Sequence, residues 1–250
     1  MSKQLRPYRV ELHVHTALSP CAEVEMIPPL IVEESLARGI DLIAITDHNS
    51  TANIQAVQKA AEGTSLVVLP GMELQTLEEV HSLCIFETLA QAEAFQKIIS
   101  LALPPIRNQP EHFGEQFVVD ETGDFLRREE QLLIVSADLS LNQAWHIVSE
   151  LGGIFIPAHV NRKAFGLLEN LGFIPQDIPI RTVEISRHLL SNEAVAKFPQ
   201  LTGYNLIKGG DAHRLEELAG MNEFWLNAPT FTEIKKAIQG DKERKIIIKD

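Results

Sequence analysis

Two histidines in the segment Val10-Glu11-Leu12-His13-Val14-His15 have a spacing that suits metal binding. Alternate side chains of a β-strand leave on the same face, so His13 and His15 would point together from one strand end. Two converging imidazoles are typical of a transition-metal site. Such pairs also occur as ordinary polar residues at strand ends, so the rest of the chain has to decide between the two interpretations.

The nine histidines of the chain are concentrated where apolar runs stop. Five follow or end such a run: His13, His15, His48, His159 and His213. His81 lies inside a predicted strand, close to its end. Four carboxylates have comparable strand-end positions: Asp47, Glu73, Glu184 and Asp211. One buried histidine usually just hydrogen-bonds a neighbour, but six gathered with carboxylates, and without thiolate, suit zinc, manganese or iron.

The other three histidines carry weaker signals. His146 lies between Trp145 and Ile147 in a predicted helix, which favours a packing or surface role, and His112 is expected to be solvated. His188 follows Arg187 just beyond a predicted strand, so this pair either contacts substrate or lies in a solvated loop.

The elements that must position these residues alternate between strand and helix. Short apolar runs at 8–15, 41–46, 65–74 and 153–160 read as strands, and helical patterns ending in glycine separate several of them. Such alternation predicts a parallel sheet, and this many units favours closure into a barrel, where the strand ends face the active site. A doubly wound open sheet is the alternative, although the glycine-rich dinucleotide loop is absent after the first strand.

Residues 106–135 interrupt this alternation. The segment EQFVVDETGDFLRRE contains a glycine turn between two strand-like runs, which predicts a β-hairpin. We expect one domain over 1–250, with 106–135 as an insertion within it.

Composition limits the partners. Asp plus Glu (34) exceed Lys plus Arg (22), which gives a formal charge of −12 and argues against binding of long duplex nucleic acid. Cys21 and Cys84 are far apart and read as reduced thiols. Neither a signal-peptide core in MSKQLRPYRV nor a long apolar run is present, so we expect a cytoplasmic protein without a membrane span.

Taken together, the motifs resemble those of the PHP family, the polymerase and histidinol phosphatase superfamily, over nearly the whole chain. The matching residues occur in order: His13-x-His15, Thr46-Asp47-His48-Asn49, Pro70-Gly71-Met72-Glu73, His81, Pro157-Ala158-His159 and Gly210-Asp211-Ala212-His213. The resemblance implies a distorted (β/α)7 barrel, a trinuclear metal centre and hydrolysis of phosphoesters. We expect two to three divalent metal ions per chain.

The resemblance also implies roles for single residues. His13 and His15 would bind one metal with Asp211, and Glu73 would bridge it to a second. His81 and His159 would hold that second metal, while His48 and His213 would hold a third. Family members often supply an aspartate to the third site in a Ser-Asp-Gly segment. Here the stretch is Ser19-Pro20-Cys21-Ala22-Glu23-Val24-Glu25, where Glu23 takes that place, with Glu25 as the other choice.

Divalent cations would neutralise phosphate oxygens, activate water and stabilise the leaving oxygen. Asp47 would orient an imidazole or take a proton, the other interpretation being a helix cap. Arginine suits a phosphate through its planar fork, so Arg162 and then Arg187 are candidate clamps, unless they are solvated loop residues.

These features favour a phosphoesterase acting on a small phosphorylated metabolite, a nucleotide or a short oligonucleotide. Histidinol-phosphate phosphatase and exonucleolytic trimming are alternatives within that class. An amidohydrolase barrel and a non-catalytic, metal-stabilised scaffold are alternatives outside it.

Overall fold

The computed structural model describes residues 5–241 and 243–250, so part of the N-terminal segment inspected for a signal peptide lies outside the described residues. Strand β1 (Arg6–Val14) pairs in parallel with β2 (Leu42–Ile45), and β2 with β3 (Val67–Gln75). The helices α1 (Pro28–Ala37) and α2 (Ile54–Ala60) connect these strands. All of β2 is buried, which explains its uninterrupted apolar run LIAI.

The sheet then reverses direction. Strand β4 (His81–Ile85) pairs antiparallel with β3, and β7 (Ile154–Pro157) pairs antiparallel with β4. The prediction of a parallel sheet is therefore wrong at these pairs. Only residues 76–80 connect β3 to β4, and a parallel crossover needs a dozen residues or more. Because β4 is reversed, its first residue, His81, lies at the rim where β1, β2, β3 and β7 end.

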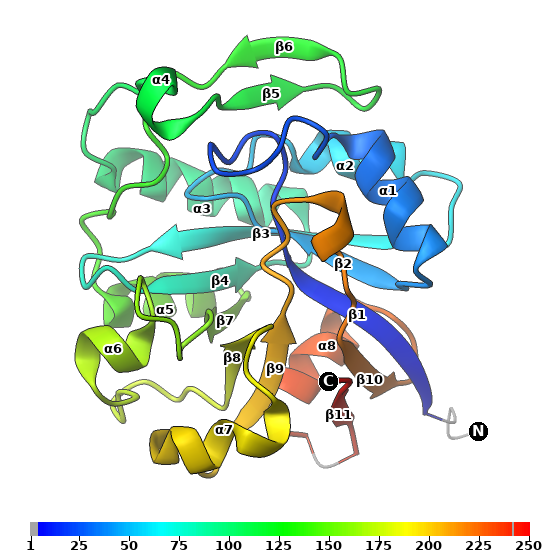
Figure 1. Cartoon of the computed structure of the whole chain (residues 1–250), viewed down its shortest axis with the longest axis vertical. Helices are drawn as coiled ribbons and strands as arrows, with labels where there is room; N and C mark the ends of the chain where they lie inside the picture. The colour runs from blue at the N-terminus through cyan, green and yellow to red at the C-terminus, as the bar shows by residue number, and fades with distance from the viewer. Residues whose placement is uncertain (1–4, 242) are drawn as a thin grey trace.

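The remaining strands complete a ring. Strands β8 (Thr182–Ser186) and β9 (Asn205–Gly209) form a parallel pair. The Val160 amide donates to the Glu184 carbonyl at 2.9 Å, which joins the end of β7 to β8. Ala212, beyond β9, exchanges backbone hydrogen bonds of 3.0 and 3.1 Å with His15 and His13. The strands thus form a curled, distorted barrel, which confirms the predicted fold class (Figure 1).

Helices cover this barrel on the outside. Helix α3 (Leu89–Ala102) begins with a capping box at Thr88, and α5 (Leu141–Glu150) begins with one at Ser140. One apolar cluster packs α1, α2, α3 and α5 against the sheet. The shorter elements α6 (Leu167–Leu171), α7 (Ser191–Lys197), η1 (Pro199–Leu201) and η2 (Leu215–Glu217) lie in the second half of the chain.

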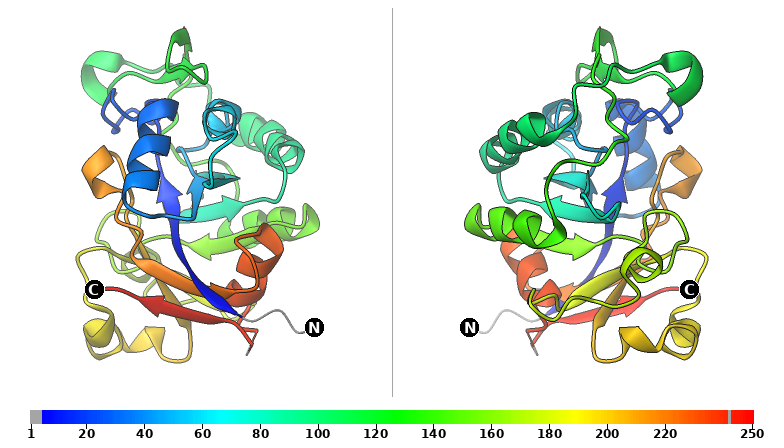
Figure 2. Two further views of the ribbon diagram at one scale, coloured as in Figure 1. Left: turned by 90° about the vertical axis from the view of Figure 1, so that its right-hand side faces the viewer. Right: turned by 90° about the vertical axis from the view of Figure 1, so that its left-hand side faces the viewer.

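The two ends of the molecule differ (Figure 2). At one end, strands β10 (Asn222–Leu226) and β11 (Lys245–Ile248) extend the sheet from the beginning of β1, and α8 (Phe231–Ile238) packs on a second apolar cluster. At the other end, α4 (Pro110–Phe113) precedes β5 (Phe117–Val119) and β6 (Phe125–Arg128), which pair antiparallel. Whether 106–135 is an insertion in a single domain stays a prediction. Within the described part of the chain, no helix is long and apolar enough to cross a membrane.

Candidate metal centre

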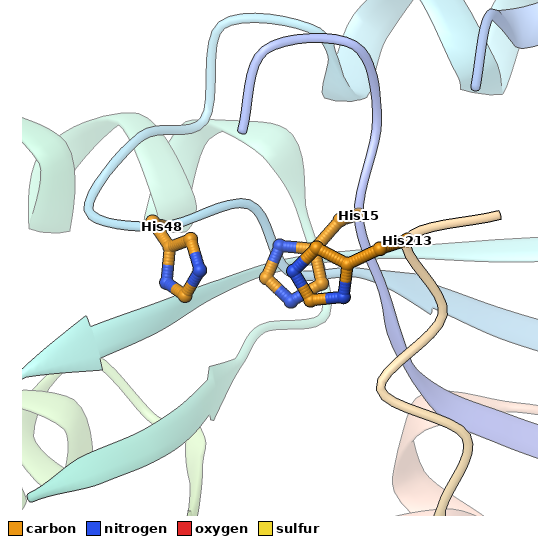
Figure 3. A group of neighbouring side chains, drawn as sticks. All are labelled: His15, His48 and His213. Carbon is orange, nitrogen blue, oxygen red and sulfur yellow. The ribbon is translucent and has the colours of Figure 1, made fainter. Parts of the chain in front are cut away.

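The rim of the barrel gathers the predicted metal ligands, with one exception. They lie in or directly beyond β1, β2, β3, β7 and β9, or at the start of β4: His13, His15, His48, Glu73, His81, His159, Asp211 and His213. Figure 3 shows how His15, His48 and His213 converge from three separate segments.

Glu73 is the centre of this arrangement. Its side chain is fully buried, and its two carboxylate oxygens lie 2.9–3.3 Å from ring nitrogens of five histidines: His13, His15, His48, His81 and His159. Asp211 lies beside it, with Oδ1 3.3 Å from Nε2 of His13 and 3.4 Å from Nε2 of His15. A single carboxylate therefore links groups that come from four different strands.

The ligand atoms fall into three overlapping groups. Within each group they all lie within 4.8 Å of one another: His13, His15, Glu73 and Asp211; His48, Glu73 and His81; and His15, His48 and His213. The first group matches the one expected from the resemblance. In the second, His48 rather than His159 accompanies Glu73 and His81, although His159 Nε2 lies 3.1 Å from Glu73 Oε1.

Unsatisfied polar atoms show that the site fits cations. Nε2 of His13, Nε2 of His15 and Oε2 of Glu73 are buried without a hydrogen-bond partner, which is costly and rare in folded proteins. Ligands bound at about 2.1 Å around one ion are separated by roughly 3.0–3.4 Å, close to the separations seen between these atoms. Imidazole and carboxylate donors together suit zinc, manganese or iron.

The carboxylates of the cluster favour positive charge beside them. Burial lowers the pKa of His13, but Glu184, Glu73 and Asp211 outweigh it and raise this pKa well above its ordinary value. Although burial alone would raise it, the neighbouring His81, His13 and His48 hold the pKa of Glu73 well below its ordinary value. Burial lowers the pKa of His213 to about 3, which keeps its ring neutral, as a metal ligand requires.

Backbone strain is concentrated at this rim. Among the described residues, the non-glycine positions with positive φ include Asn49 (48°), His159 (28°), Phe165 (58°) and Asp211 (47°). His159 and Asp211 are candidate ligands directly beyond strand ends, where a left-handed residue redirects the chain. Such conformations cost about 1–3 kcal/mol each and tend to occur at functional sites.

Two glycines make room for buried carboxylates below the rim. A Cβ at Gly209 would lie 2.2 Å from Cδ of Glu184, and a Cβ at Gly210 would lie 2.8 Å from Oε2 of Glu11. Glu184 Oε1 lies 3.0 Å from His13 Nδ1 and accepts a 3.0 Å hydrogen bond from the His159 amide. The Gly209-Gly210 pair before Asp211 is therefore required by the packing of Glu184 and Glu11.

Comparison with known proteins agrees with this geometry. The model of the PHP domain family matches residues 11–163. The chain belongs to the PHP family. Its match to the uncharacterized protein YqxK of Bacillus subtilis is 26% identical over 242 residues, covering 87% of this chain and 56% of YqxK. A 77-residue match to the 5'-3' exoribonuclease Rnm of Salmonella typhimurium is 32% identical and covers 30% of this chain and 25% of Rnm.

A solved structure with the same fold is the lesion-specific endonuclease EndoQ of Pyrococcus furiosus. It superposes with a TM-score of 0.74 at 21% identity, covering 96% of this chain and 58% of EndoQ. The PHP chain described here thus spans just over half the length of YqxK and of EndoQ. The likeness to EndoQ extends the shared fold beyond the segment that the family model matches.

Asp47, a predicted catalytic residue of this PHP domain, is buried and hydrogen-bonds to neighbouring residues of the protein. Its carboxylate accepts hydrogen bonds of 2.7 Å from the backbone amide and hydroxyl of Thr16 and of 2.8 Å from the Ser19 hydroxyl. The Ser19 oxygen lies 2.8 Å from His15 Nδ1. Asp47 therefore orients the His15 imidazole through Ser19, which was not among the predicted site residues.

The other predicted catalytic residues line a cleft of about 690 Å³ above the cluster. Arg162 Nη1 pairs with the carboxylate of Asp211. Arg187 Nη2 lies 2.7 Å from Glu217 Oε1, and His188 is exposed. Both predicted phosphate-binding arginines thus hold carboxylates at the cleft.

Glu23 is the exception among the predicted ligands. Its side chain is 47% exposed and lies 2.9 Å from Nε of Arg214, outside all three groups of ligand atoms. Turns closed by Ala22 N to Ser19 O (2.9 Å) and Met26 N to Glu23 O (3.0 Å) direct it toward the surface. The structure thus pairs Glu23 with Arg214 and does not bring it to the other predicted ligands of the third site.

Two further residues contact candidate metal ligands, although the sequence did not predict these contacts. Glu184 was noted as a strand-end carboxylate, but its bond to His13 was not predicted. Gln75 Oε1 lies 3.3 Å from His81 Nε2 and lines the cleft. Gln75 is two residues from Glu73 in β3, so the alternation of a strand was the signal that could have indicated it.

Proposed function

We propose that this PHP domain is a metal-dependent phosphoesterase that hydrolyses a small phosphorylated metabolite, a nucleotide or a short oligonucleotide. One observation carries the proposal: the buried Glu73 carboxylate lies between five histidines while its Oε2 and two of the facing imidazole nitrogens lack hydrogen-bond partners. A centre of two to three manganese, zinc or iron ions would satisfy these atoms. Glu23 has no part in it.

Bound divalent cations would neutralise phosphate oxygens, lower the pKa of water and stabilise the leaving oxygen. The residues of this chain have separate tasks. Glu184 fixes the ring of His13, and the Asp47–Ser19 pair fixes the ring of His15. Such supports set the orientation of a ligand and raise its basicity.

Arg162 and Arg187 are the proposed contacts to the phosphate, with His188 at the mouth of the cleft. Both guanidinium groups lie at the cleft and pair with carboxylates, Asp211 and Glu217. A phosphate oxygen entering the cleft would offer each arginine a second anionic acceptor in planar geometry. Because Arg162 also holds Asp211, it would connect substrate binding to the first group of ligands.

Charge and relatives limit the substrate. The formal charge of −12 disfavours long duplex nucleic acid, as does the location of the site in a cleft lined by several carboxylates. The names of Rnm and EndoQ describe nucleases, which supports a substrate that contains nucleotides. We propose that the substrate is a single nucleotide or a short oligonucleotide. We also propose that the chain acts as one domain in the cytoplasm.

The test is hydrolysis by metal-loaded protein of p-nitrophenyl phosphate and its bis-ester. We expect turnover of at least one ester and none of amide or lactone substrates. His13→Ala should abolish turnover, whereas His146→Ala, which changes an exposed histidine in α5, should not affect it. Turnover of amides or lactones would favour the amidohydrolase alternative. Full metal loading without hydrolysis of any phosphoester would favour the non-catalytic scaffold.

A further inference from the structure

Phe165 is an aromatic side chain in a cleft that is otherwise lined mainly by charged and polar groups. It lies in the loop between β7 and α6 and is 37% exposed. Most large apolar side chains of this domain are buried in the two main clusters, whereas Phe165 is partly exposed and lines this polar cleft.

The ring has a fixed position beside the metal centre. It stacks on the imidazole of His81 with a centroid separation of 4.5 Å and an interplanar angle of 4°. The carbonyl of Phe165 accepts a 3.1 Å hydrogen bond from the His81 amide. Since His81 covers one face of the ring, only the opposite face is available for stacking on a ligand in the cleft.

The backbone of this loop is strained to hold that position. Phe165 has a φ of 58°, which is unfavourable for any residue with a Cβ. The following Gly166 packs so closely that a Cβ there would lie 2.0 Å from the Arg162 carbonyl oxygen. This tight turn carries both Arg162 and Phe165, and both side chains line the cleft.

We propose that Phe165 is a specificity-determining residue whose free face stacks on a nucleobase of the substrate. The inference rests on the proposed phosphoesterase function and names its substrate class as nucleotides. Stacking on an aromatic side chain recognises any base, since every base has a π-face. Arg162, three residues earlier, would contact the phosphate of the same nucleotide while the base lies on Phe165.

A different role for Phe165 is to shield His81 from solvent. Leucine would keep an apolar cover of similar size over His81 but remove the aromatic face. The two roles therefore separate in the variant Phe165→Leu: loss of stacking affects only ligands that carry a base, whereas loss of shielding affects every phosphate ligand.

The experiment measures equilibrium binding to metal-loaded protein by calorimetry. The ligands are the phosphonate analogues of adenosine 5′-monophosphate and ribose 5-phosphate, which a phosphoesterase does not hydrolyse. Base stacking predicts that the wild-type protein binds the nucleotide analogue about 5- to 100-fold more tightly than the sugar analogue. Phe165→Leu should bring this ratio to within twofold of one, without changing binding of the sugar analogue. Phe165→Tyr should keep the wild-type ratio.

Phe173→Leu is the matched control, because Phe173 is 58% exposed and lies outside the cleft lining. It should leave both affinities unchanged. A wild-type ratio near one, or equal weakening of both ligands in Phe165→Leu, would overturn the proposal. Hydrolysis of p-nitrophenyl esters is measured on the same samples. If that hydrolysis persists while the ratio is near one, only the stacking proposal fails, whereas its absence contradicts the phosphoesterase function.

Discussion

Two buried carboxylates, one in α8 and one in β3, have different surroundings. Glu233, in α8, accepts hydrogen bonds from Arg244 Nε (3.1 Å) and Nη2 (2.7 Å) and from the Asn227 amide (3.1 Å). Glu73, at the barrel rim, lies among histidines whose nitrogens face it at similar distances. Yet Glu73 Oε2 has no hydrogen-bond partner, and Glu233 is not among the residues with unsatisfied buried atoms.

This difference in hydrogen bonding distinguishes a structural carboxylate, Glu233, from a candidate metal ligand, Glu73. A buried charge whose oxygens are all paired stabilises the fold and needs nothing further. Glu73 is a buried charge among incompletely paired imidazoles, in a region of strained backbone. This arrangement destabilises the fold, and a bound cation would offset that destabilisation. The comparison predicts that changing Glu73 affects metal binding and changing Glu233 affects stability.

The largest effect is expected for Glu73→Gln. This change removes the negative charge shared by two of the three groups of ligand atoms, so bound metal should fall below one ion per chain. Phosphoester hydrolysis should fall more than about 100-fold, since supports of metal ligands already cost 10–100-fold when removed. Elemental analysis and an esterase assay measure both quantities. Retention of the full metal content in this variant would contradict the central place of Glu73.

Glu184→Gln should have the next largest effect. The amide keeps the volume that Gly209 accommodates but weakens the interaction with His13 Nδ1. We expect metal affinity to fall about 10–100-fold, measured by competition with a chromophoric chelator. Asp120→Asn, in the exposed β5–β6 turn, is the control and should not change affinity. Unchanged affinity in Glu184→Gln would mean that His13 is oriented by other contacts.

Glu233→Gln should leave metal content and activity unchanged while lowering stability. Removing one partner of the paired Arg244 should lower the free energy of unfolding by about 2 kcal/mol. For a chain of this size the thermal midpoint would fall by about 4–8 °C. Chemical denaturation of the two proteins checks this expectation. Loss of metal in this variant would contradict the assignment of a purely structural role to Glu233.

The pair of Glu233 and Arg244 also predicts that the free energy of unfolding depends on pH. Hydrogen bonds from Arg244, supported by Asn227 and Lys236, lower the pKa of Glu233 to about 2 from its ordinary 4.5. A lowered pKa stabilises the folded state fully above about pH 4.5, and this contribution is lost as the pH falls toward 2. The stability difference between wild-type protein and Glu233→Gln should therefore shrink over that window. A difference that stays constant down to pH 3 would contradict the assigned pair.

The smallest effect is expected for Glu23→Gln. The pair between Glu23 and Arg214 is about half exposed, so its loss should change stability by less than about 1 kcal/mol. The number of bound metal ions should not change. Loss of one ion per chain would show that Glu23 belongs to the third site despite its position beside Arg214.

Most of the site could be predicted because strand ends determine it. His13, His48, Glu73, His159 and Asp211 follow or end apolar runs, and the barrel brings those ends to one rim. The reversal of β4 was not predicted, although the short connection before His81 contained the information. The reversal of β4 explains why His81, at the beginning of its strand, lies beside residues at the ends of other strands.

Positions outside strands were less predictable. Glu23 was placed by counting residues back from Pro28, but turns at Ser19–Ala22 and Glu23–Met26 control where its side chain points. The engagement of Asp47 with Thr16 and Ser19 likewise depends on the conformation of that loop. Loop direction follows from local hydrogen bonds and tertiary contacts, which sequence periodicity does not encode.

An anomalous difference map from crystals of zinc-loaded protein tests the central claim most directly. The account predicts at least two strong peaks flanking the carboxylate of Glu73. One peak should lie about 2.0–2.2 Å from ligand atoms of His13, His15 and Asp211. Zinc peaks confined to the protein surface, with none beside Glu73, would contradict the assignment of this rim as a metal centre.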